Sequence, residues 1–306
     1  MNLSLDRRRF LAATASLASG VIGSTVVTSS AKAETQHNNG GHKLCVFTKP
    51  FNSLSFDELA DRIAEMGFDG IEAPIRKGGH IETEAIADEL PKLVEALKKR
   101  NLDITLVASD INDPEAPITE TFLRTLGTLG LKRYRMKYFY YDQDLPLQHQ
   151  FDEWNARLKQ LAAMNHDFGI QGLYQNHAGT KYLGSSIWDL REAMKGINPA
   201  DLGVAYDIRH ATVEGANHWP VTFKAIRPQI EFVYVKDFDW IDKKVKNVPL
   251  GEGMVKSSFF EMLADSGYAG PISLHEEYLN HRDPKLVPDH LAAIKKDVNK
   301  LRSWLK

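Results

Sequence analysis

Polar and ionisable side chains follow several short apolar runs of this chain. Asp207 closes one such run, and His210 comes three residues later. His275 and Glu277 stand two residues apart after another run, so in a strand they would share one face. Carboxylates and imidazoles can hold a divalent cation or move a proton. Lys236, after a third run, can neutralise negative charge that develops on a substrate oxygen.

Apolar runs alternate with amphipathic stretches from residue 44 onward. Several runs are almost continuously apolar, which is typical of strands buried on both faces. The expected strands are 44–49, 70–75, 103–109, 133–140, 171–176, 202–208, 230–236 and 271–276. The expected helices are 55–66, 82–100, 118–129, 149–168, 186–196, 220–228, 257–266 and 287–304. This alternation predicts an α/β fold, a single (β/α)8 TIM barrel over residues 44–306.

An open, doubly wound sheet is the alternative fold. Such a sheet usually carries fewer strands, and no Gly-rich dinucleotide fingerprint follows the first expected strand. Ser55 and Glu58 have the spacing of a capping box, and Pro91 is expected to split or kink the second helix. Glycines that can end helices in the left-handed conformation follow four helices: Gly67, Gly130, Gly169 and Gly267.

The N-terminus predicts export. Arginines precede a weakly apolar run at 10–30, and an Ala-x-Ala sequence ending at Ala33 closes it, as in a secretory signal. Arg7-Arg8, followed by Phe10-Leu11, resembles the twin-arginine class of signal. That resemblance implies a signal peptide at 1–33, cleavage after Ala33, the twin-arginine export machinery as a partner and a folded protein in the periplasm. An ordinary secretory signal or a retained anchor is the alternative.

Composition restricts the partners of the exported protein. The apolar run is too rich in small and polar residues for a permanent span, so no stable membrane span is expected after cleavage. Without residues 1–33 the net charge is about −5, which provides no basic field for nucleic acid. Cys45 is the only cysteine, which rules out an intrachain disulfide, and we expect it to be a buried strand thiol. Residues 34–43 are polar and Gly/Asn-rich and predict a flexible leader.

Six short motifs carry a resemblance to a known family. They are Gly67-Phe-Asp-Gly70-Ile-Glu72, Asn176-His177, Asp207-x-x-His210, Lys236-Asp237, Gly251-Glu252-Gly253 and Gly267-Tyr-x-Gly270-Pro271-Ile. In this order, over residues 44–304, the chain resembles the xylose isomerase-like TIM-barrel superfamily, in particular its sugar phosphate isomerase/epimerase group. The resemblance implies an enzyme that removes a proton next to the carbonyl of a sugar.

The resemblance also implies a divalent metal ion, either Mn, Mg, Zn or Co. Family members bind it with a Glu, an Asp, a His and a Glu from the later strands. In this chain the corresponding positions hold Gln175, Asp207, Tyr234 and His275, so the standard quartet is altered. The ligand set expected here is Asp207, His210, His275, Glu277 and Gln175.

The remaining roles are assigned by position at the expected barrel mouth. The expected catalytic residues are Glu72, Lys236, His177 and Glu277. The expected substrate-binding residues are Arg209, Glu252, Trp219 and Trp240.

Structural roles are the alternatives for several of these residues. Asp207 can cap the following helix, His177 can be a hydrogen-bonded strut, and Lys236 can pair with Asp237. Glu277 can be an ion-pair partner, and Arg209 can form a salt bridge at a helix start.

Three functions remain open at this point. The first is a carbohydrate isomerase or epimerase that works through an enediolate with metal assistance. The second is a keto-glycoside lyase, in which the same proton removal is followed by β-elimination. The third is a non-catalytic sugar-binding barrel, because the metal quartet is altered. Phosphorylated sugars are not expected, because they are scarce outside the cytoplasm and no Gly-rich phosphate cradle is present.

Overall fold

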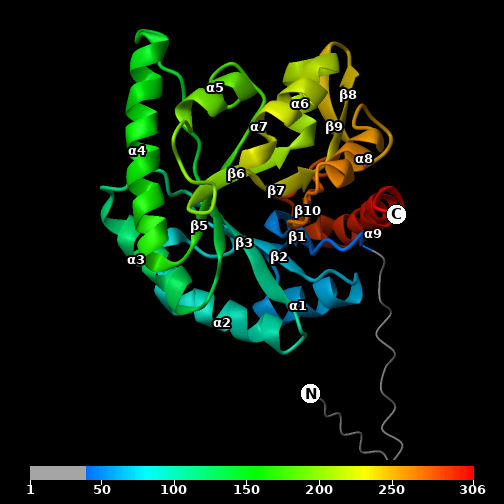
Figure 1. The fold of residues 1–306 in the computed structure, drawn as a ribbon. Coiled ribbons are helices and arrows are strands. Elements are labelled where there is room, and N and C mark those ends of the chain that lie inside the picture. Colours follow the sequence, from blue (N-terminus) through cyan, green and yellow to red (C-terminus); the bar gives the residue numbers. More distant parts are fainter. Residues whose placement is uncertain (1–38) are drawn as a thin grey trace, which may run out of the picture. The chain divides into compact units, whose positions relative to one another are not determined.

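Eight short strands pair in parallel and close into a barrel in the computed structural model, which describes residues 39–306 (Figure 1). They are β1 (Leu44–Phe47), β2 (Gly70–Ile75), β3 (Asp103–Ser109), β4 (Arg133–Arg135), β5 (Gln171–Gln175), β6 (Leu202–Asp207), β7 (Ile230–Val235) and β10 (Ile272–Leu274). Their order around the barrel is β1-β10-β7-β6-β5-β4-β3-β2. This closed parallel barrel confirms the predicted (β/α)8 fold. The predicted signal peptide at 1–33 and residues 34–38 of the leader lie outside the described residues, so export stays a prediction.

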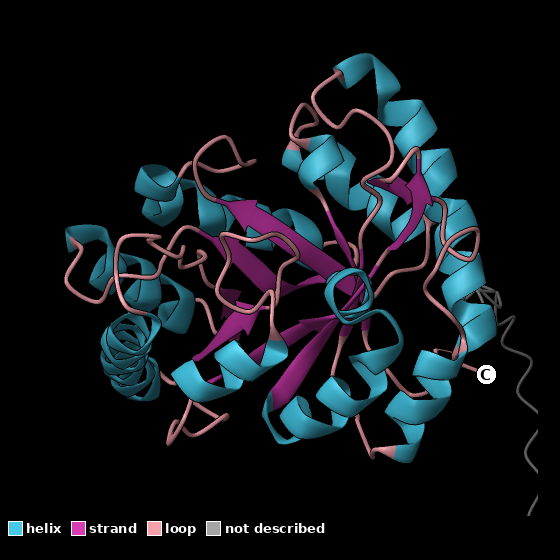
Figure 2. Ribbon diagram, turned by 90° about the horizontal axis from the view of Figure 1, so that it is seen from above, coloured by secondary structure: helices cyan, strands magenta, loops and turns pink. Residues whose placement is uncertain are grey.

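Helices surround the strands on the outside, as the view from above shows (Figure 2). They are α1 (Phe56–Glu65), α2 (Ile86–Lys98), α3 (Pro117–Thr128), α4 (Leu147–Phe168), α5 (Ile187–Ala193), α6 (Ile208–Gly215), α7 (Trp219–Ile226), α8 (Ser258–Asp265) and α9 (Val287–Trp304). Helix α6 was not predicted, because it starts directly at the end of β6 with no loop between them. Within residues 39–306 no helix is both long and apolar enough to cross a membrane.

The local helix signals act as predicted, with one exception. Ser55 and Glu58 form both hydrogen bonds of a capping box at the start of α1. The four glycines that follow helices all have φ between 66° and 74°. Pro91 does not split α2, which runs unbroken from Ile86 to Lys98. A separate 3-10 turn at Thr83–Ala85 precedes it, so the division of the predicted helix falls before the proline.

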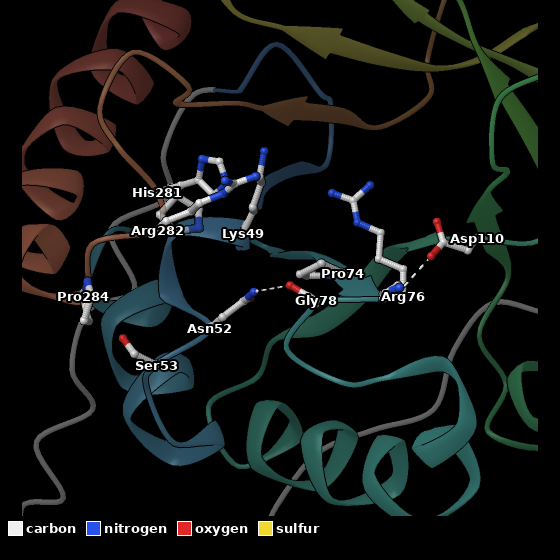
Figure 3. Close-up of a pocket in the computed structure, with 13 residues that line it drawn as sticks. Lys49, Asn52, Ser53, Pro74, Arg76, Gly78, Asp110, His281, Arg282 and Pro284 are labelled. Atoms are coloured by element: carbon white, nitrogen blue, oxygen red, sulfur yellow. Dashed lines mark hydrogen bonds between the residues drawn. The ribbon is translucent and has the colours of Figure 1, made fainter. Parts of the chain in front are cut away.

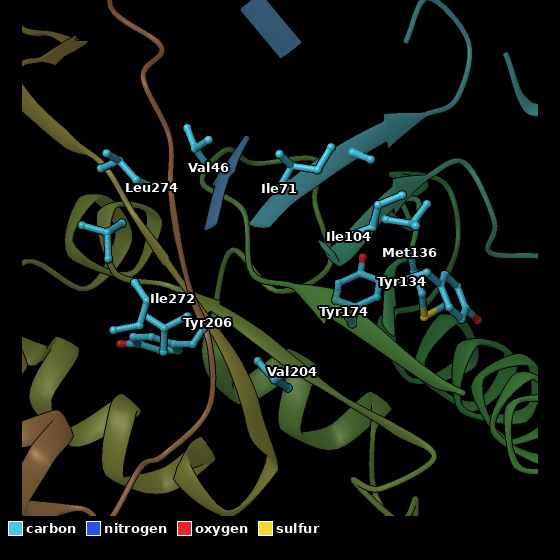
Figure 4. Close-up of a cluster of buried hydrophobic side chains, with 14 of the residues drawn as sticks. Val46, Ile71, Ile104, Tyr134, Met136, Tyr174, Val204, Tyr206, Ile272 and Leu274 are labelled. Atoms are coloured by element: carbon cyan, nitrogen blue, oxygen red, sulfur yellow. The ribbon is translucent and has the colours of Figure 1, made fainter. Parts of the chain in front are cut away.

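Two apolar clusters hold the barrel together. One fills the inside of the barrel and consists of Cys45, Leu106, Leu173, Ala205, Phe232 and Tyr234. The other, larger cluster lies between the strands and the helices, where outward side chains such as Ile71, Tyr174 and Tyr206 are fully buried (Figure 4). Burial on both faces explains the almost continuous apolar runs. Cys45 is a buried free thiol, as predicted.

The structure contains a two-stranded antiparallel sheet that the sequence did not predict. It consists of β8 (Asp237–Ile241) and β9 (Lys244–Val248), directly after β7. Both strands alternate polar and apolar residues over only three to four positions, and the turn uses Asp242 and Lys243 at φ 52° and 60° in place of the usual Asn-Gly. This hairpin therefore lacked the turn signal of a hairpin.

The end of the predicted flexible leader is fixed to the barrel. Asn39 accepts a hydrogen bond from Arg302 and its amide lies 3.4 Å from the Asp69 carboxylate. His42 stacks on Tyr268, with 5.6 Å between ring centroids. Residues of this segment thus have partners on α9 and before β2 and β10, and the flexibility of the leader stays a prediction.

Candidate active site

Four side chains from β5, β6, β7 and β10 meet at the carboxyl ends of these strands. We call them the lysine cluster: Lys236, Asp207, Glu277 and Gln175. Lys236 Nζ lies 2.9 Å from Glu277 Oε2 and 3.3 Å from Asp207 Oδ2. Gln175 Nε2 donates to Asp207 Oδ2 over 2.9 Å. The cluster thus places one ammonium between two carboxylates.

The charges of the lysine cluster stabilise one another. Burial lowers the pKa of Lys236, but Asp207 and Glu277 outweigh burial, so that this pKa lies above its ordinary value. Burial raises the pKa of Glu277, but Lys236 and His275 outweigh it, and the pKa of this carboxyl is held far below its usual range. At neutral pH the lysine is therefore a cation and Glu277 is an anion.

Asp207 has a structural role and a site role at the same time. Its Oδ1 accepts the backbone N–H of His210 over 3.1 Å and caps helix α6. Its Oδ2 faces Gln175 and Lys236. The cap fixes the carboxylate, so the ammonium of the lysine is held in one position.

Two imidazoles lie beside the lysine cluster. The ring centroids of His177 and His210 are 4.0 Å apart. Burial and the charge of Lys236 lower the pKa of His177 to about 4, and the same two causes place the pKa of His210 well below its ordinary value. Arg209 donates to His210 Nδ1 over 3.0 Å, which leaves the proton on Nε2, a buried atom with no hydrogen-bond partner among the described residues. Both rings are neutral near pH 7.

A buried carboxylate positions a third imidazole on the other side of Lys236. Glu72 accepts from His275 Nε2 over 2.7 Å, from Ser273 over 2.8 Å and from Tyr234 over 3.2 Å. Burial raises the pKa of Glu72, but His275 and Ser273 outweigh it, and the net shift is downward. Because an ionised carboxylate only accepts, His275 carries its proton on Nε2.

The free nitrogen of His275 points toward the lysine cluster. Its Nδ1 is buried, has no hydrogen-bond partner among residues 39–306, and lies 4.0 Å from Glu277 Oε1. Phe47 stacks on the ring, with centroids 4.7 Å apart. An imidazole that donates one ring N–H to a carboxylate and leaves the other nitrogen without a partner has the arrangement of a general base.

The predicted metal ligands do not fit a divalent cation in this arrangement. No group of three or more His, Cys, Asp or Glu side chains in the described part of the chain is placed to hold a metal ion. Asp207 and Glu277 both face the Lys236 ammonium, Glu72 engages His275 Nε2, and Arg209 engages His210 Nδ1. The ammonium lies where a cation between the two carboxylates would have to lie.

The other predicted substrate residues lie apart from the lysine cluster, except for Arg209. Arg209 donates to Asn247 and to His210 beside the cluster. Glu252 is exposed and pairs with Lys296 over 2.6 Å. Trp219 packs against Phe259 on the helix side of the barrel. Trp240 is 51% exposed on β8.

The motif Gly251-Glu252-Gly253 has a structural role, because its backbone N–H groups bind a carboxylate. Asp237 accepts four backbone N–H groups, from Phe238, Gly251, Gly253 and Val255. A Cβ at Gly253 would lie 2.2 Å from the carbonyl oxygen of Phe238, so no larger residue fits there. Asp237 therefore fixes the loop after the hairpin and forms no ion pair with Lys236.

Sequence reasoning missed two residues near the site because the fourth strand was predicted too long. Strand β4 ends at Arg135, although 133–140 was predicted. Arg135 is therefore a buried strand-end cation, and its guanidinium lies over the Tyr138 ring. Tyr138 donates to Gln175 Oε1 over 2.6 Å. Had the predicted strand ended before the polar Lys137, Arg135 and Tyr138 would have been expected at the barrel mouth.

Comparisons with known proteins agree with this fold. The family model for the xylose isomerase-like TIM barrel matches residues 60–304. No curated protein matches the chain. Among solved structures, 3-keto-D-glucoside 4-epimerase (YcjR) from E. coli is 16% identical, with a TM-score of 0.65 over 86% of this chain and 99% of that chain.

Two further solved structures are similar to a comparable degree. The probable 3-DHS dehydratase AsbF from Bacillus anthracis is 18% identical, with a TM-score of 0.64 over 85% of this chain and 98% of that chain. A D-tagatose 3-epimerase-like protein is 20% identical, with a TM-score of 0.62 over 84% of this chain and 98% of that one. At these identities the likeness establishes the fold alone.

Proposed function

We propose that this chain, which belongs to the xylose isomerase-like TIM barrel family, is a sugar epimerase or isomerase that removes a proton next to a carbonyl. The observation that carries the proposal is the buried Glu72–His275 pair beside the Lys236 ammonium. A general base and a fixed positive charge are the two groups that enolisation of a keto-sugar needs. The names of two similar structures, a 3-keto-D-glucoside 4-epimerase and a D-tagatose 3-epimerase-like protein, agree with it.

His275 is the proposed base. Its Nδ1 takes the proton from the carbon next to the substrate carbonyl, and Glu72 stabilises the imidazolium that forms. The electron pair of the broken C–H bond moves into the carbonyl, giving an enediolate with negative charge on oxygen. Return of the proton to the opposite face of the same carbon gives the epimer, and return to the neighbouring carbon gives the isomer.

Lys236 is the proposed stabiliser of the enediolate oxygen. Asp207 and Glu277 keep it charged and fixed, so little reorganisation is needed when the negative charge develops. Because the predicted metal ligands do not fit a cation as arranged, no step of this proposal passes through a metal ion.

A lyase is the second candidate, and one observation favours it. Epimerisation needs a second group that returns a proton to the other face of the carbon, and the two other imidazoles beside the lysine cluster, His177 and His210, are neutral because their pKa values are lowered. If no proton is delivered there, the enediolate of a keto-glycoside can expel its leaving group from the β-carbon instead. The first step and its residues, His275 and Lys236, would be unchanged.

Incubation in D2O with a panel of sugars and 3-keto-glucosides tests the proposal. We expect deuterium at the carbon next to the carbonyl, measured by NMR. An unchanged formula with altered stereochemistry supports the epimerase, and a released aglycone or water supports the lyase. Sugar binding without deuterium exchange for any member of the panel would reject both and favour a non-catalytic sugar-binding barrel.

Two controls connect the exchange to the proposed groups. His275→Asn should abolish deuterium exchange, whereas His149→Asn, at an exposed histidine of α4, should leave it unchanged. Treatment with a chelator should also leave the rate unchanged. A chelated protein that loses activity and regains it with Mn²⁺ would overturn the role of Lys236.

A further inference from the structure

A pocket of about 720 Å³ opens at the carboxyl ends of β10, β1 and β2, which are neighbours in the barrel. Lys49 follows β1, Arg76 follows β2, and His281 and Arg282 lie in the loop after β10. Figure 3 shows Lys49, His281 and Arg282 together at one end of the pocket and Arg76 at the other end. Loops from three adjacent strands thus bring basic side chains around one space.

The pocket has an excess of positive charge. Four basic side chains and one acidic side chain line it: Lys49, Arg76, Lys77, Arg282 and Asp110. None of the four basic groups forms an ion pair with any residue in 39–306. The Asp110 carboxylate accepts the backbone N–H of Lys77 over 3.0 Å and forms no ion pair with the side-chain cations.

Partial burial makes this excess of positive charge unfavourable. Burial lowers the pKa of Arg76, and the nearby cation Arg135 lowers it further. Burial also lowers the pKa of Lys49. Glu277 opposes this shift, and Arg76 is among the cations that add to it. Like charges that lie close together without an ion-pair partner gain when an anion binds between them.

The basic pocket adjoins the proposed catalytic groups. The Arg76 guanidinium lies over the Phe47 ring, 5.5 Å from its centroid, and Phe47 stacks on His275. Lys49 is close enough to Glu277 for its charge to shift the Lys49 pKa upward. His275 does not line the pocket itself, but Phe47 contacts both His275 and Arg76 and so connects the proposed base to the pocket.

We infer that the basic pocket binds the anionic group of an acidic sugar, a carboxylate or, against the expectation from the sequence, a phosphate, while the reacting carbon lies at His275 and Lys236. The inference rests on the proposed function for the position of the reacting carbon. Arg76 offers a planar donor group that suits a carboxylate or a phosphate, and Lys49 offers a point charge from the opposite side. A neutral sugar would leave these cations without a partner.

Calorimetric titration of the full chain tests the pocket without requiring turnover. The probes are D-glucuronate, D-glucose 6-phosphate and D-glucose. We expect one of the two anionic probes to bind at least about 10-fold more tightly than D-glucose, since hydrogen bonds to charged groups contribute more than neutral ones. Tighter D-glucuronate identifies the carboxylate, and tighter D-glucose 6-phosphate identifies the phosphate. Equal affinities, or no binding of either anion, would overturn the inference.

A double variant and a matched control distinguish an effect of the pocket cations from an effect of the overall charge of the protein. Lys49→Gln with Arg76→Gln should remove the preference for the anionic probe. Arg124→Gln, at an exposed arginine that pairs with Glu120 on α3, should retain it. A preference that survives the double variant rejects the inference. If the anion binds selectively but no substrate exchanges deuterium, the pocket stands and the proposed function fails.

Discussion

The two sides of the barrel mouth differ in how their charges are balanced. On the side of β6 and β7, Lys236 is buried between two carboxylates. On the side of β1 and β2, Lys49 and Arg76 line an open pocket without an ion-pair partner among residues 39–306. The comparison separates two uses of a cation. A paired, buried cation is fixed and ready to stabilise a developing charge, whereas an unpaired cation is free to take an external anion.

The largest expected effect comes from removing the paired cation. Lys236→Met should lower kcat/KM by about 10³-fold, because the enediolate oxygen loses its counter-charge. It should also lower the free energy of unfolding by about 3–5 kcal/mol, because the fully buried Asp207 and the partly exposed Glu277 lose their shared cation. Lys296→Met, at an exposed lysine that pairs with Glu252, should change stability by less than about 1 kcal/mol.

Lys236→Arg keeps this prediction testable if the methionine variant does not fold. The arginine retains the charge, so the fold should persist while activity falls, since a planar guanidinium does not match the position of the ammonium. Full activity in a folded Lys236→Met protein would remove the distinction between the two sides.

Loss of the carboxylate beneath His275 should have the next largest effect. Glu72→Gln removes the negative charge that stabilises the His275 imidazolium, and its amide can donate to Nε2 as well as accept from it, so that the proton on Nε2 is no longer fixed and kcat should fall by about 10²-fold. Ser273→Ala removes a different hydrogen bond to the same carboxylate and should cost much less. Steady-state kinetics on both variants would measure this, and equal losses would indicate a merely structural role.

Acidification should lower the free energy of unfolding, because the neutral imidazoles on the side of β6 and β7 take up protons. The pKa of His177 is about 4 in the folded chain and 6.5 without the fold, so between these values the unfolded chain binds a proton that the folded one does not. The free energy of unfolding should therefore fall as the pH drops from about 6.5 to about 4, by roughly 1–2 kcal/mol for this partly exposed group. His210 acts in the same direction.

Urea unfolding across this pH range measures the slope. His177→Gln should flatten it, while His149→Gln on the surface of α4 should not. An unchanged slope in the first variant would mean that His177 is protonated equally in both states.

The smallest expected effect is that of salt, which should change KM but not kcat. The open pocket is screened by ions, so KM for an acidic substrate should rise about threefold between 50 and 500 mM NaCl. The buried ion pairs of Lys236 are screened much less, so kcat should stay constant. A salt-dependent kcat with a constant KM would reverse the assignment of the two cation groups.

The sequence predicted where the reactive groups meet better than what each of them does. Asp207, His210, Lys236 and His275 were predicted at strand ends because polar residues follow apolar runs, and these residues do meet. The role of His275 was not predicted, because it depends on its hydrogen bond to Glu72, 203 residues away in the chain. The basic pocket was missed for a similar reason, since Lys49, Arg76 and Arg282 come from three separate loops.

The amino-acid sequence by itself determined the barrel. Apolar periodicity, helix-capping residues and glycines at helix ends are local properties that neighbouring residues fix. Only the tertiary structure decided which charges are neutralised. Lys236 could have paired with its neighbour Asp237, but that carboxylate accepts backbone N–H groups of the next loop. The lysine pairs with Asp207 and Glu277 instead. Ion pairing depends on distances of a few ångströms between distant segments, and those distances exist only once the barrel has closed.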